Sequence, residues 1–264
     1  MLTGVDHISV LCSQPNDLIN TVSAQLDVPI LIPVRDYGDF CSGLLRIGNL
    51  DIEFVRIGEE AIFTPYFYGI GFSSAENVWN TAAWLKTSKI PHTLPVHTAV
   101  MRDGQQWGWS TILLQGFLDD PIPAPYSLGV LSGNGWTARN ISAATNTLMK
   151  LPAIRRFASR KAGSSMCFVC HYDQDLSGLR SSASQQLKAN GGGKNQIVEV
   201  QSIVVEANRQ VTDWKALLKE EIHNPKLVIQ AGARNQIREI IIKTASLTPI
   251  LTMQFGNAVF SFQA

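Results

Sequence analysis

The sequence has few charged residues and almost no net charge. Asp, Glu, Lys and Arg make up 16% of its 264 residues, and the formal net charge is +1 at pH 7. A nucleic-acid-binding surface is normally basic, so this balance predicts no nucleic-acid partner. No apolar run reaches the roughly 18 residues that a membrane-spanning helix needs, so no membrane partner is expected either.

Cysteine is also scarce. The N-terminus lacks a basic region followed by a long apolar segment, which predicts a cytoplasmic protein with reduced thiols. Cys167 and Cys170 have the C-x-x-C spacing of zinc ligands. In a strand, however, residues three apart point to opposite faces, and no second such pair completes a zinc site. We therefore expect these two residues, with Cys12 and Cys41, to be structural thiols.

Two strand-like segments each hold one potential metal ligand. Residues 5–11 contain His7 and residues 50–55 contain Glu53, both in otherwise apolar β patterns. Alternate side chains of a strand share a face, so His7 is expected beside Ser9. A histidine or carboxylate on an apolar face needs a compensating partner, which makes both residues candidates for a functional site.

The order of predicted elements repeats along the chain. Residues 5–55 read as one βαβββ unit, and a second unit starts at Tyr68. When the two are aligned, Tyr68 stands at the position of His7 and Leu113 at the position of Glu53. The second unit therefore has no evident ligand pair.

A third unit is predicted near the C-terminus. It starts at Ile197 and ends with the strand Arg238 to Thr244 or with a further strand at Ala258 to Phe262. Its first strand contains Gln201 and a later strand contains Glu239, so it again offers a donor followed by a Glu. The repeat divides the chain into three parts: residues 1–120 as an N-terminal pair of βαβββ units, residues 121–163 as an insertion, and residues 164–264 as a closing strand plus a C-terminal βαβββ unit.

The insertion opens with a series of prolines at 121–125, which cannot join a central strand. A predicted helix at 154–161 is basic on one side and apolar on the other. This helix is either an ordinary surface helix or part of a lid or oligomer contact whose arginines meet an anionic substrate. A glycine-rich loop at 190–194 lacks the spacing of a phosphate-binding loop and is expected to be a flexible connector.

The element order and several short motifs resemble the vicinal oxygen chelate superfamily, and within it the glyoxalase-like domain proteins. The superfamily includes glyoxalase I, extradiol dioxygenases, fosfomycin-modifying enzymes and bleomycin-resistance proteins. The resemblance covers most of the chain except residues 121–163. The motifs are Val5-Asp6-His7-Ile8, the strand Leu50 to Val55, Phe168-Val169-Cys170-His171 and Ala189-Asn190-Gly191-Gly192.

The resemblance implies an α+β fold in which tandem βαβββ units form cup-shaped half-barrels, as in the glyoxalase, bleomycin-resistance and dihydroxybiphenyl dioxygenase fold. It also implies a divalent metal ion held by the first and last strands of the units, and a homodimer. One ligand set, similar to that of glyoxalase I, consists of His7, Glu53, Gln201 and Glu239. Zinc, nickel, cobalt, manganese or iron would then act as a Lewis acid, and Glu239 would take a proton next to a carbonyl.

Two other arrangements stay open. If residues 121–163 are an insertion, the strand after them brings His171 toward His7 and Glu53, which resembles the extradiol dioxygenase triad. In the other arrangement no metal is bound. His7 is then hydrogen-bonded within the cup, and Glu53 pairs with one of three arginines, Arg35, Arg46 or Arg56.

Aromatic residues predict a pocket that stacks a flat, partly aromatic molecule. His92 and His97, in a loop before a strand, are further pocket candidates. The leading function is a metal-dependent lyase or dioxygenase-type enzyme that acts on a small oxygen-rich molecule. The alternative is a metal-free protein that binds and sequesters a small molecule. The expected lining residues are Tyr68, Phe72, Trp107 and Trp109.

Overall fold

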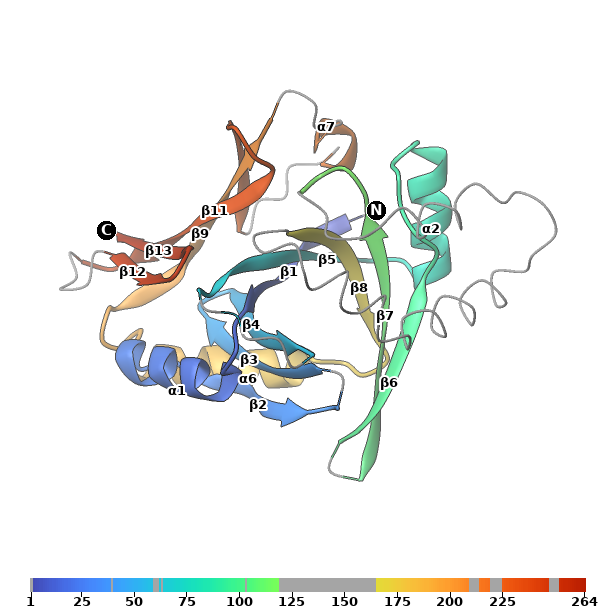
Figure 1. Ribbon diagram of the computed structural model, residues 1–264. Coiled ribbons are helices and arrows are strands. Elements are labelled where there is room, and N and C mark those ends of the chain that lie inside the picture. The colour runs from blue at the N-terminus through green and yellow to red at the C-terminus, as the bar shows by residue number, and fades with distance from the viewer. Residues whose placement is uncertain are drawn as a thin grey trace.

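The structure is a computed structural model whose described residues form two β-sheets and several helices (Figure 1). The described residues are 2–38, 40–58, 62, 64–102, 104–118, 165–208, 214–218, 225–246 and 252–264. The predicted insertion, with its basic helix at 154–161, lies outside the described residues.

The first βαβββ unit contains the two strands that hold His7 and Glu53. Its helix begins at Pro15, where a missing backbone N–H costs no hydrogen bond. It ends at Asp27, which has a left-handed φ of 56° and donates its N–H to the carbonyl of Ser23. The elements are β1 (Leu2–Leu11), α1 (Pro15–Leu26), β2 (Ile30–Asp36), β3 (Phe40–Ile47) and β4 (Leu50–Ile57).

The second βαβββ unit closes with a strand that follows the insertion. Asn77 caps its helix by accepting hydrogen bonds from the backbone N–H groups of Trp79 and Asn80. The predicted alignment of Leu113 with the last strand is wrong, because that strand is the third of the unit and the last one begins at Met166. The elements are β5 (Tyr66–Ser74), α2 (Val78–Thr87), β6 (Val96–Arg102), β7 (Gln105–Leu114) and β8 (Met166–Tyr172).

The eight strands of the two units form one sheet in the order β2-β3-β4-β1-β5-β8-β7-β6. In each unit the first strand pairs in parallel with the last, and the antiparallel pair β1–β5 joins the units. Phe40 of β3 and Trp109 of β7 are far apart in this order, yet their ring centroids are 5.9 Å apart. The sheet therefore curls into a cup, which confirms the predicted α+β fold of tandem βαβββ units.

The C-terminal part forms a separate five-stranded sheet in the order β10-β9-β11-β13-β12. Here the first strand pairs in parallel with the next one, β10, and antiparallel with β11. The predicted strands and helix are present, but the first strand does not pair in parallel with the last, as it does in the two N-terminal units. The elements are α6 (Ser177–Ala189), β9 (Ile197–Ala207), α7 (Trp214–Leu217), β10 (Lys226–Ala231), β11 (Gln236–Thr244), β12 (Thr252–Phe255) and β13 (Ala258–Gln263).

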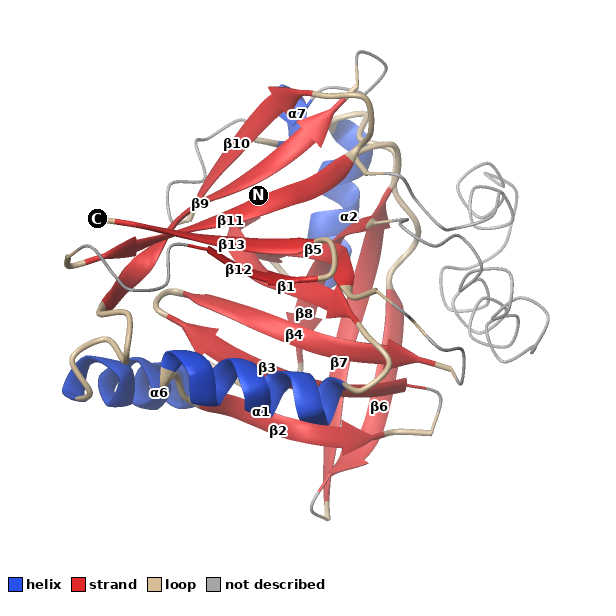
Figure 2. Ribbon diagram, turned by 60° about the vertical axis from the view of Figure 1, so that its left-hand side comes forward, coloured by secondary structure: helices blue, strands red, loops and turns tan. Residues whose placement is uncertain are grey.

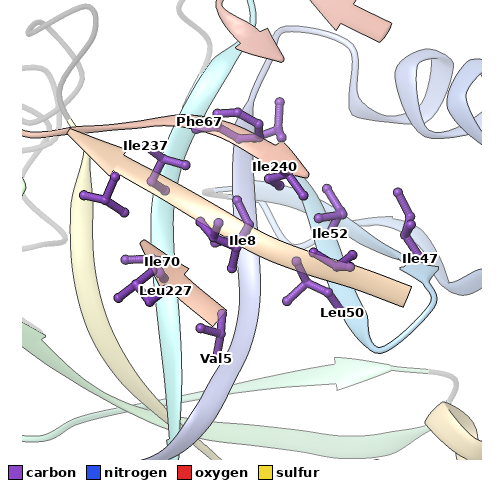
Figure 3. Close-up of a cluster of buried hydrophobic side chains, with 14 of the residues drawn as sticks. Val5, Ile8, Ile47, Leu50, Ile52, Phe67, Ile70, Leu227, Ile237 and Ile240 are labelled. Atoms are coloured by element: carbon purple, nitrogen blue, oxygen red, sulfur yellow. The ribbon is translucent and has the colours of Figure 1, made fainter. Parts of the chain in front are cut away.

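The five-stranded sheet packs on the outer face of the cup. Side chains of both sheets meet in one apolar cluster, in which Ile8 and Ile52 lie near Ile240 (Figure 3). Burial of each such side chain contributes about 1.5–3 kcal/mol. Because one face of β1 and β4 is filled in this way, the alternate side chains, including His7 and Glu53, point into the cup.

Helices α1 and α6 run beside the β2–β3 edge of the cup (Figure 2). Ile19, Val22 and Leu26 of α1 are buried in the core between the sheets. Ala183 of α6 instead packs against Ile32, which lines the inside of the cup. Helix α6 therefore packs against β2 and β3 of the cup, although it follows both units in the chain.

The glycine-rich loop at 190–194 has a structural role. Its Lys194 donates its backbone N–H to the carbonyl of Leu26 (3.0 Å) and its Nζ to the carbonyl of Ala24 (2.8 Å), at the C-terminal end of α1. Gly193 has a φ of 70°, and a β-carbon there would lie 2.3 Å from the carbonyl oxygen of Leu26. The loop is a fixed cap on α1, so the prediction of a flexible connector is wrong.

The four cysteines are free thiols, as the sequence predicts. Cys170 lines the cavity, whereas Cys167 belongs to the apolar core. The two therefore lie on opposite faces of β8. In the parts of the chain that the structure describes, no helix has the length and apolar character needed to span a membrane.

Candidate functional site

A cavity of about 670 Å³ occupies the inside of the cup. Such a volume is typical of small-molecule sites. Both units contribute polar side chains to its lining, and the second unit also contributes two tryptophans. At one side of the cavity, Phe40 contacts the edge of Trp109 and also packs against Tyr37, with ring centroids 4.9 Å apart.

His7 and Glu53 meet in this cavity, with 3.6 Å between His7 Nε2 and Glu53 Oε2. Two hydroxyl groups hold the carboxylate. Ser9 donates to Glu53 Oε2 (2.7 Å), and Ser42 donates to Glu53 Oε1 (2.6 Å). Glu53 is therefore held by two serine hydroxyls. Of the arginines proposed for it, Arg46 pairs with Asp51 instead, at 2.6 Å.

A β-bulge in β1 adds an acid to this pair. Opposite β5, Val5 is in register with Phe72 and His7 with Gly71, so Asp6 is the extra residue. A bulge turns its extra side chain toward the face of its neighbour. Asp6 Oδ2 thereby lies 2.7 Å from His7 Nδ1, and the carboxylate, the imidazole and Glu53 form a chain that leads into the cavity.

The chain continues away from the cavity through buried ion pairs. Arg180 of α6 donates to Asp6 Oδ1 through Nη2 (2.9 Å) and to Asp51 Oδ2 through Nε (2.6 Å). Asp51 is fully buried and also accepts from Arg46. The Tyr172 hydroxyl donates to Asp6 Oδ2 at 3.0 Å. Each buried carboxylate therefore has charged or hydroxyl donors, as a stable buried charge requires.

These contacts shift the pKa values of the site. Burial acts to raise the pKa of Asp6, but the hydrogen bonds and charges of His7 and Arg180 outweigh it and lower the pKa to about 2. Burial acts to lower the pKa of His7, but Asp6, Glu53 and Asp51 outweigh it and raise the pKa. The arrangement therefore favours ionised Asp6 and protonated His7.

Gly71 of β5 makes room for the imidazole. A β-carbon at Gly71 would lie 2.9 Å from His7 Cε1 and 2.9 Å from a ring carbon of Phe168. The rings of His7 and Phe168 fill this space, with centroids 5.3 Å apart. Gly69 is similarly close to Phe168. Any side chain at Gly71 would displace His7 from its position.

Three of the four aromatic residues predicted to bind substrate line the cavity: Tyr68, Trp107 and Trp109. Tyr68 reaches it because it is the extra residue of a second bulge, between the pairs Ser9–Gly69 and Val10–Phe67. Phe72 does not line the cavity. It is fully buried in the core, on the opposite face of its strand from Gly71. The role of the three lining residues in binding stays a prediction.

The remaining candidate histidines lie in different places. His97 lines the cavity, and its Nε2 lies 3.0 Å from Asp173 Oδ2. His92 is not among the lining residues and bonds through Nδ1 to the carbonyl of Ile90. His171 follows Cys170 on β8, and Cys170 lines the cavity. Because neighbouring side chains of a strand point to opposite faces, His171 lies on the other face. The structure therefore does not bring His171 into the predicted dioxygenase-like triad.

The structure does not bring together the glyoxalase-like quartet either. Gln201 is exposed in the five-stranded sheet, at an irregularity between the pairs Val200–Ile242 and Ser202–Ile241. Glu239 lies in the same sheet and accepts a hydrogen bond from Ser261. Neither residue lines the cavity that holds His7 and Glu53. The two halves of the quartet belong to different sheets, which the similar sequence pattern concealed.

The side chains present do not supply a full metal-ligand set. Among the described residues, no group of three or more His, Cys, Asp and Glu side chains is placed to hold a metal ion. His7 Nε2 and the Glu53 carboxylate are two donors, whereas catalytic zinc sites usually have three protein ligands. Both oxygens of Glu53 also accept serine hydroxyls already. The described donors therefore do not fit a resident metal ion.

Sequence reasoning missed Asp6, Ser42, Tyr172 and Arg180. Strict strand alternation places Asp6 on the face opposite His7, and only the pairing with β5 reveals the bulge. Arg180 and Tyr172 reach Asp6 from 174 and 166 residues away in the sequence. The Asp-His dipeptide is the one local signal that was present, and it becomes meaningful only with the strand register.

No family model and no curated protein matches the sequence. Among solved structures, a hypothetical protein from Staphylococcus aureus is 14% identical, with a TM-score of 0.60, over 100% of this chain and 99% of that chain. The Mn(II)-bound glyoxalase from Novosphingobium aromaticivorans is 9% identical, with a TM-score of 0.48, over 99% and 81% of the two chains. Methylmalonyl-CoA epimerase from Mycobacterium tuberculosis is 9% identical, with a TM-score of 0.35, over 48% and 83%.

These structural neighbours thus include a glyoxalase and an epimerase, both at low identity. Likeness at this level concerns the fold alone. The resemblance to the vicinal oxygen chelate superfamily is confirmed for the fold by the two βαβββ units of the chain, which share one curled sheet.

Proposed function

We propose that this protein is an enzyme that transfers a proton on a small, oxygen-bearing and partly aromatic molecule, with His7 and Glu53 as the reacting groups. The observation that carries the proposal is the Asp6–His7–Glu53 chain, which ends in a cavity with an aromatic wall. Substrates of this kind have a C–H bond next to a carbonyl, and the reaction is an isomerisation or a lyase-type rearrangement.

The buried charges favour an enzyme over a simple binding protein. Asp6 is 6% exposed and His7 5% exposed. Removing such ions from water costs several kcal/mol each unless partners offset it. An aromatic pocket for sequestration needs no such groups, whereas strongly perturbed ionisable residues in a cavity are typical of catalytic sites. A catalytic role of Asp6 and His7 would explain why the protein buries these charged groups despite the loss of their hydration.

The geometry also assigns roles to the two residues. Ser9 and Ser42 hold the Glu53 carboxylate in one orientation, so it is positioned to accept a proton from carbon. His7 Nε2 is its neighbour at 3.6 Å and is positioned to donate to a substrate oxygen on which negative charge develops. Stacking on Trp107 and Trp109 would hold the conjugated part of the substrate. The mechanism uses no metal ion, since the described donors do not complete a metal site.

A second candidate is metal-free sequestration of a small aromatic compound. The observation that favours it is the extent of the aromatic wall, including the Phe40–Trp109 contact that joins the two ends of the curled sheet. In this case the ligand binds without chemical change, and the His7–Glu53 pair only forms hydrogen bonds to it.

Deuterium exchange separates the two candidates. A panel of aromatic α-hydroxyketones and 1,3-dicarbonyl compounds is incubated with the protein in D2O, and loss of the carbon-bound proton is followed by ¹H NMR. The wild-type protein is expected to accelerate exchange in at least one compound, and Glu53→Gln to abolish the acceleration. Glu206→Gln is the matched control, because Glu206 bonds to Gln236 in the five-stranded sheet and not in the cavity. Saturable binding without exchange would favour sequestration.

A further inference from the structure

Asp6 is the most highly bonded carboxylate beside the cavity. Its Oδ2 accepts from the Tyr172 hydroxyl at 3.0 Å and lies 2.7 Å from His7 Nδ1, and its Oδ1 accepts from Arg180 Nη2 at 2.9 Å. The bulge in β1 makes these contacts possible, because it turns Asp6 to the side of His7. Regular pleating would instead place Asp6 on the face opposite His7.

The contacts of His7 leave the imidazole one orientation. With Asp6 bonded to Nδ1, the other nitrogen, Nε2, faces Glu53 and the cavity. Phe168 packs against the ring, and the space that the ring occupies exists only because residue 71 is a glycine. A carboxylate bonded to one nitrogen of a histidine fixes which nitrogen carries the proton and how the ring is turned.

Arg180 connects this arrangement to a different part of the chain. It lies in the first turns of α6, outside both βαβββ units, and its guanidinium bonds to Asp6 of β1 and Asp51 of β4. Two separate nitrogens make these bonds, a geometry that the single ammonium of a lysine does not reproduce. The guanidinium also lies over the ring of Tyr172, with Cζ 6.0 Å from the centroid.

We propose that Asp6 and Arg180 are positioning residues: Asp6 keeps a proton on His7 Nδ1 and directs Nε2 at the ligand, and Arg180 holds Asp6 in place from α6. This inference rests on the proposed function for its catalytic consequence. The state of the imidazole can nevertheless be measured in the protein without any ligand.

The primary test is ¹⁵N NMR of the histidine rings. The chain has five histidines, and His7→Gln identifies the signals of His7. In the wild-type protein, Nδ1 is expected to keep its proton when the ring becomes neutral at alkaline pH, and Nε2 to be the nitrogen that loses it. Asp6→Asn is expected to reverse the two nitrogens or to mix both forms. Asp173→Asn is the matched control, since it removes the acid of the other His–Asp pair and should alter His97 alone.

A pair of arginine variants tests the role of Arg180. Arg180→Met removes a partner from both Asp6 and Asp51. Arg46→Met removes a partner from Asp51 and from Ser184 but none from Asp6. Both variants are expected to lower the melting temperature. Only Arg180→Met should change the ¹⁵N signals of His7, and Arg180→Lys should restore them in part.

The same variants are then compared in the deuterium exchange assay. Asp6→Asn and Arg180→Met are expected to slow exchange at least about 10-fold, as removal of a partner behind a functional histidine usually does. Arg46→Met should slow it much less.

Unchanged His7 signals in a folded Arg180→Met protein would overturn the role of Arg180, and unchanged signals in Asp6→Asn would overturn that of Asp6. If Asp6→Asn does not fold, Tyr172→Phe replaces it, because it removes one of the hydrogen bonds to the same carboxylate oxygen. Unchanged His7 signals in that variant as well as in Arg180→Met would reject the positioning arrangement. Shifted signals without any detectable exchange would retain the positioning and reject the proposed reaction.

Discussion

The two βαβββ units have the same strand pairing but present different side chains to the shared cavity. The first unit contributes ionisable and hydroxyl groups. The second unit contributes a wall of aromatic residues and, at the middle of the sheet, a glycine, Gly71, that leaves space for His7. The contrast is between His7, Ser9, Ser42 and Glu53 on one side and Tyr68, Trp107, Trp109 and Phe168 on the other.

This difference indicates a division of roles within a duplicated fold. A cavity with three or more ligands close together would be suited to a metal ion. Among the described residues no such group exists, because His7 and Glu53 of the first unit meet as a pair and His97 of the second unit is paired with Asp173. The cavity-facing residues of β8, the equivalent of β4, include Phe168 and Cys170 where β4 has Glu53. Burial raises the pKa of the Cys170 thiol well above its ordinary value, so it is not a reactive thiolate. We therefore assign chemistry to the first unit and binding to the second.

The largest expected effect is on the rate. Glu53→Gln keeps the shape of the side chain and removes the base, so the exchange rate should fall about 100- to 10,000-fold, the usual contribution of general acid–base catalysis. The ligand dissociation constant, measured by calorimetry, should change only a few-fold. A fall of less than about 10-fold would show that the first unit does not supply the base.

The next effect concerns stability and pH. Asp6 has a pKa lowered from 3.8 to about 2, so its stabilisation, on the order of 2 kcal/mol, is present above pH 3.8 and is lost as the pH falls toward 2. His7 has a pKa raised from 6.5, so its stabilisation is present below pH 6.5 and is lost as the pH rises through the folded-state value. Urea unfolding should show that both contributions are complete between about pH 4 and 6.5.

Asp6→Asn is the informative variant for this pH dependence. It removes the carboxylate and the main partner of His7, so it should flatten both limbs of the stability profile. If the acidic limb in the variant is as steep as in the wild-type protein, other carboxylates are responsible for it.

A smaller effect is expected from the aromatic wall. Trp109→Ala removes a stacking surface, so ligand affinity should fall about 10-fold while the exchange rate at saturation changes little. Trp79→Ala is the matched control, because Trp79 is 49% exposed on α2 and does not line the cavity. If Trp109→Ala reduces the saturated rate as much as the affinity, the division of roles between the units is wrong.

The smallest expected effect is that of metal removal. Elemental analysis of protein purified without a chelator should find well under one divalent ion per chain, and EDTA should leave both melting temperature and ligand binding unchanged. The reason is that the described residues offer two donors instead of the usual three. A stoichiometric metal that is lost in His7→Ala would show that a further ligand completes the site.

The sequence predicted the fold better than the site. Apolar alternation and helix spacing identified β1, α1 and β4, and the same alternation correctly directed His7 and Glu53 to one face. It also predicted a closing strand after the insertion, where β8 lies, although the alignment of the first two units gave that place to Leu113. It did not give the strand order of the C-terminal sheet, because periodicity defines which face of a strand is buried and not which strand lies beside it.

The site depends on properties that no local pattern contains. Tyr68 was expected in the cavity because it is aromatic, but it lies there because of a bulge. Phe72, four residues later in the same strand, was expected there for the same reason and lies in the core. Arg180 was not a candidate, because a single arginine between two predicted units has no signal of its own. Its role follows from tertiary contacts with carboxylates on two strands.

The bulge at Asp6 also determines how this site should be sought in other sequences. An Asp-His pair in the first strand of a similar unit is not sufficient, because in a regular ladder the acid would point into the core. The diagnostic property is the strand register. Between the pairs Val5–Phe72 and His7–Gly71, β1 has one residue that has no partner in β5. A homologue without this extra residue can have the sequence Asp-His and still have no carboxylate bonded to its imidazole. Alignments should therefore match the strand register as well as the residue identities.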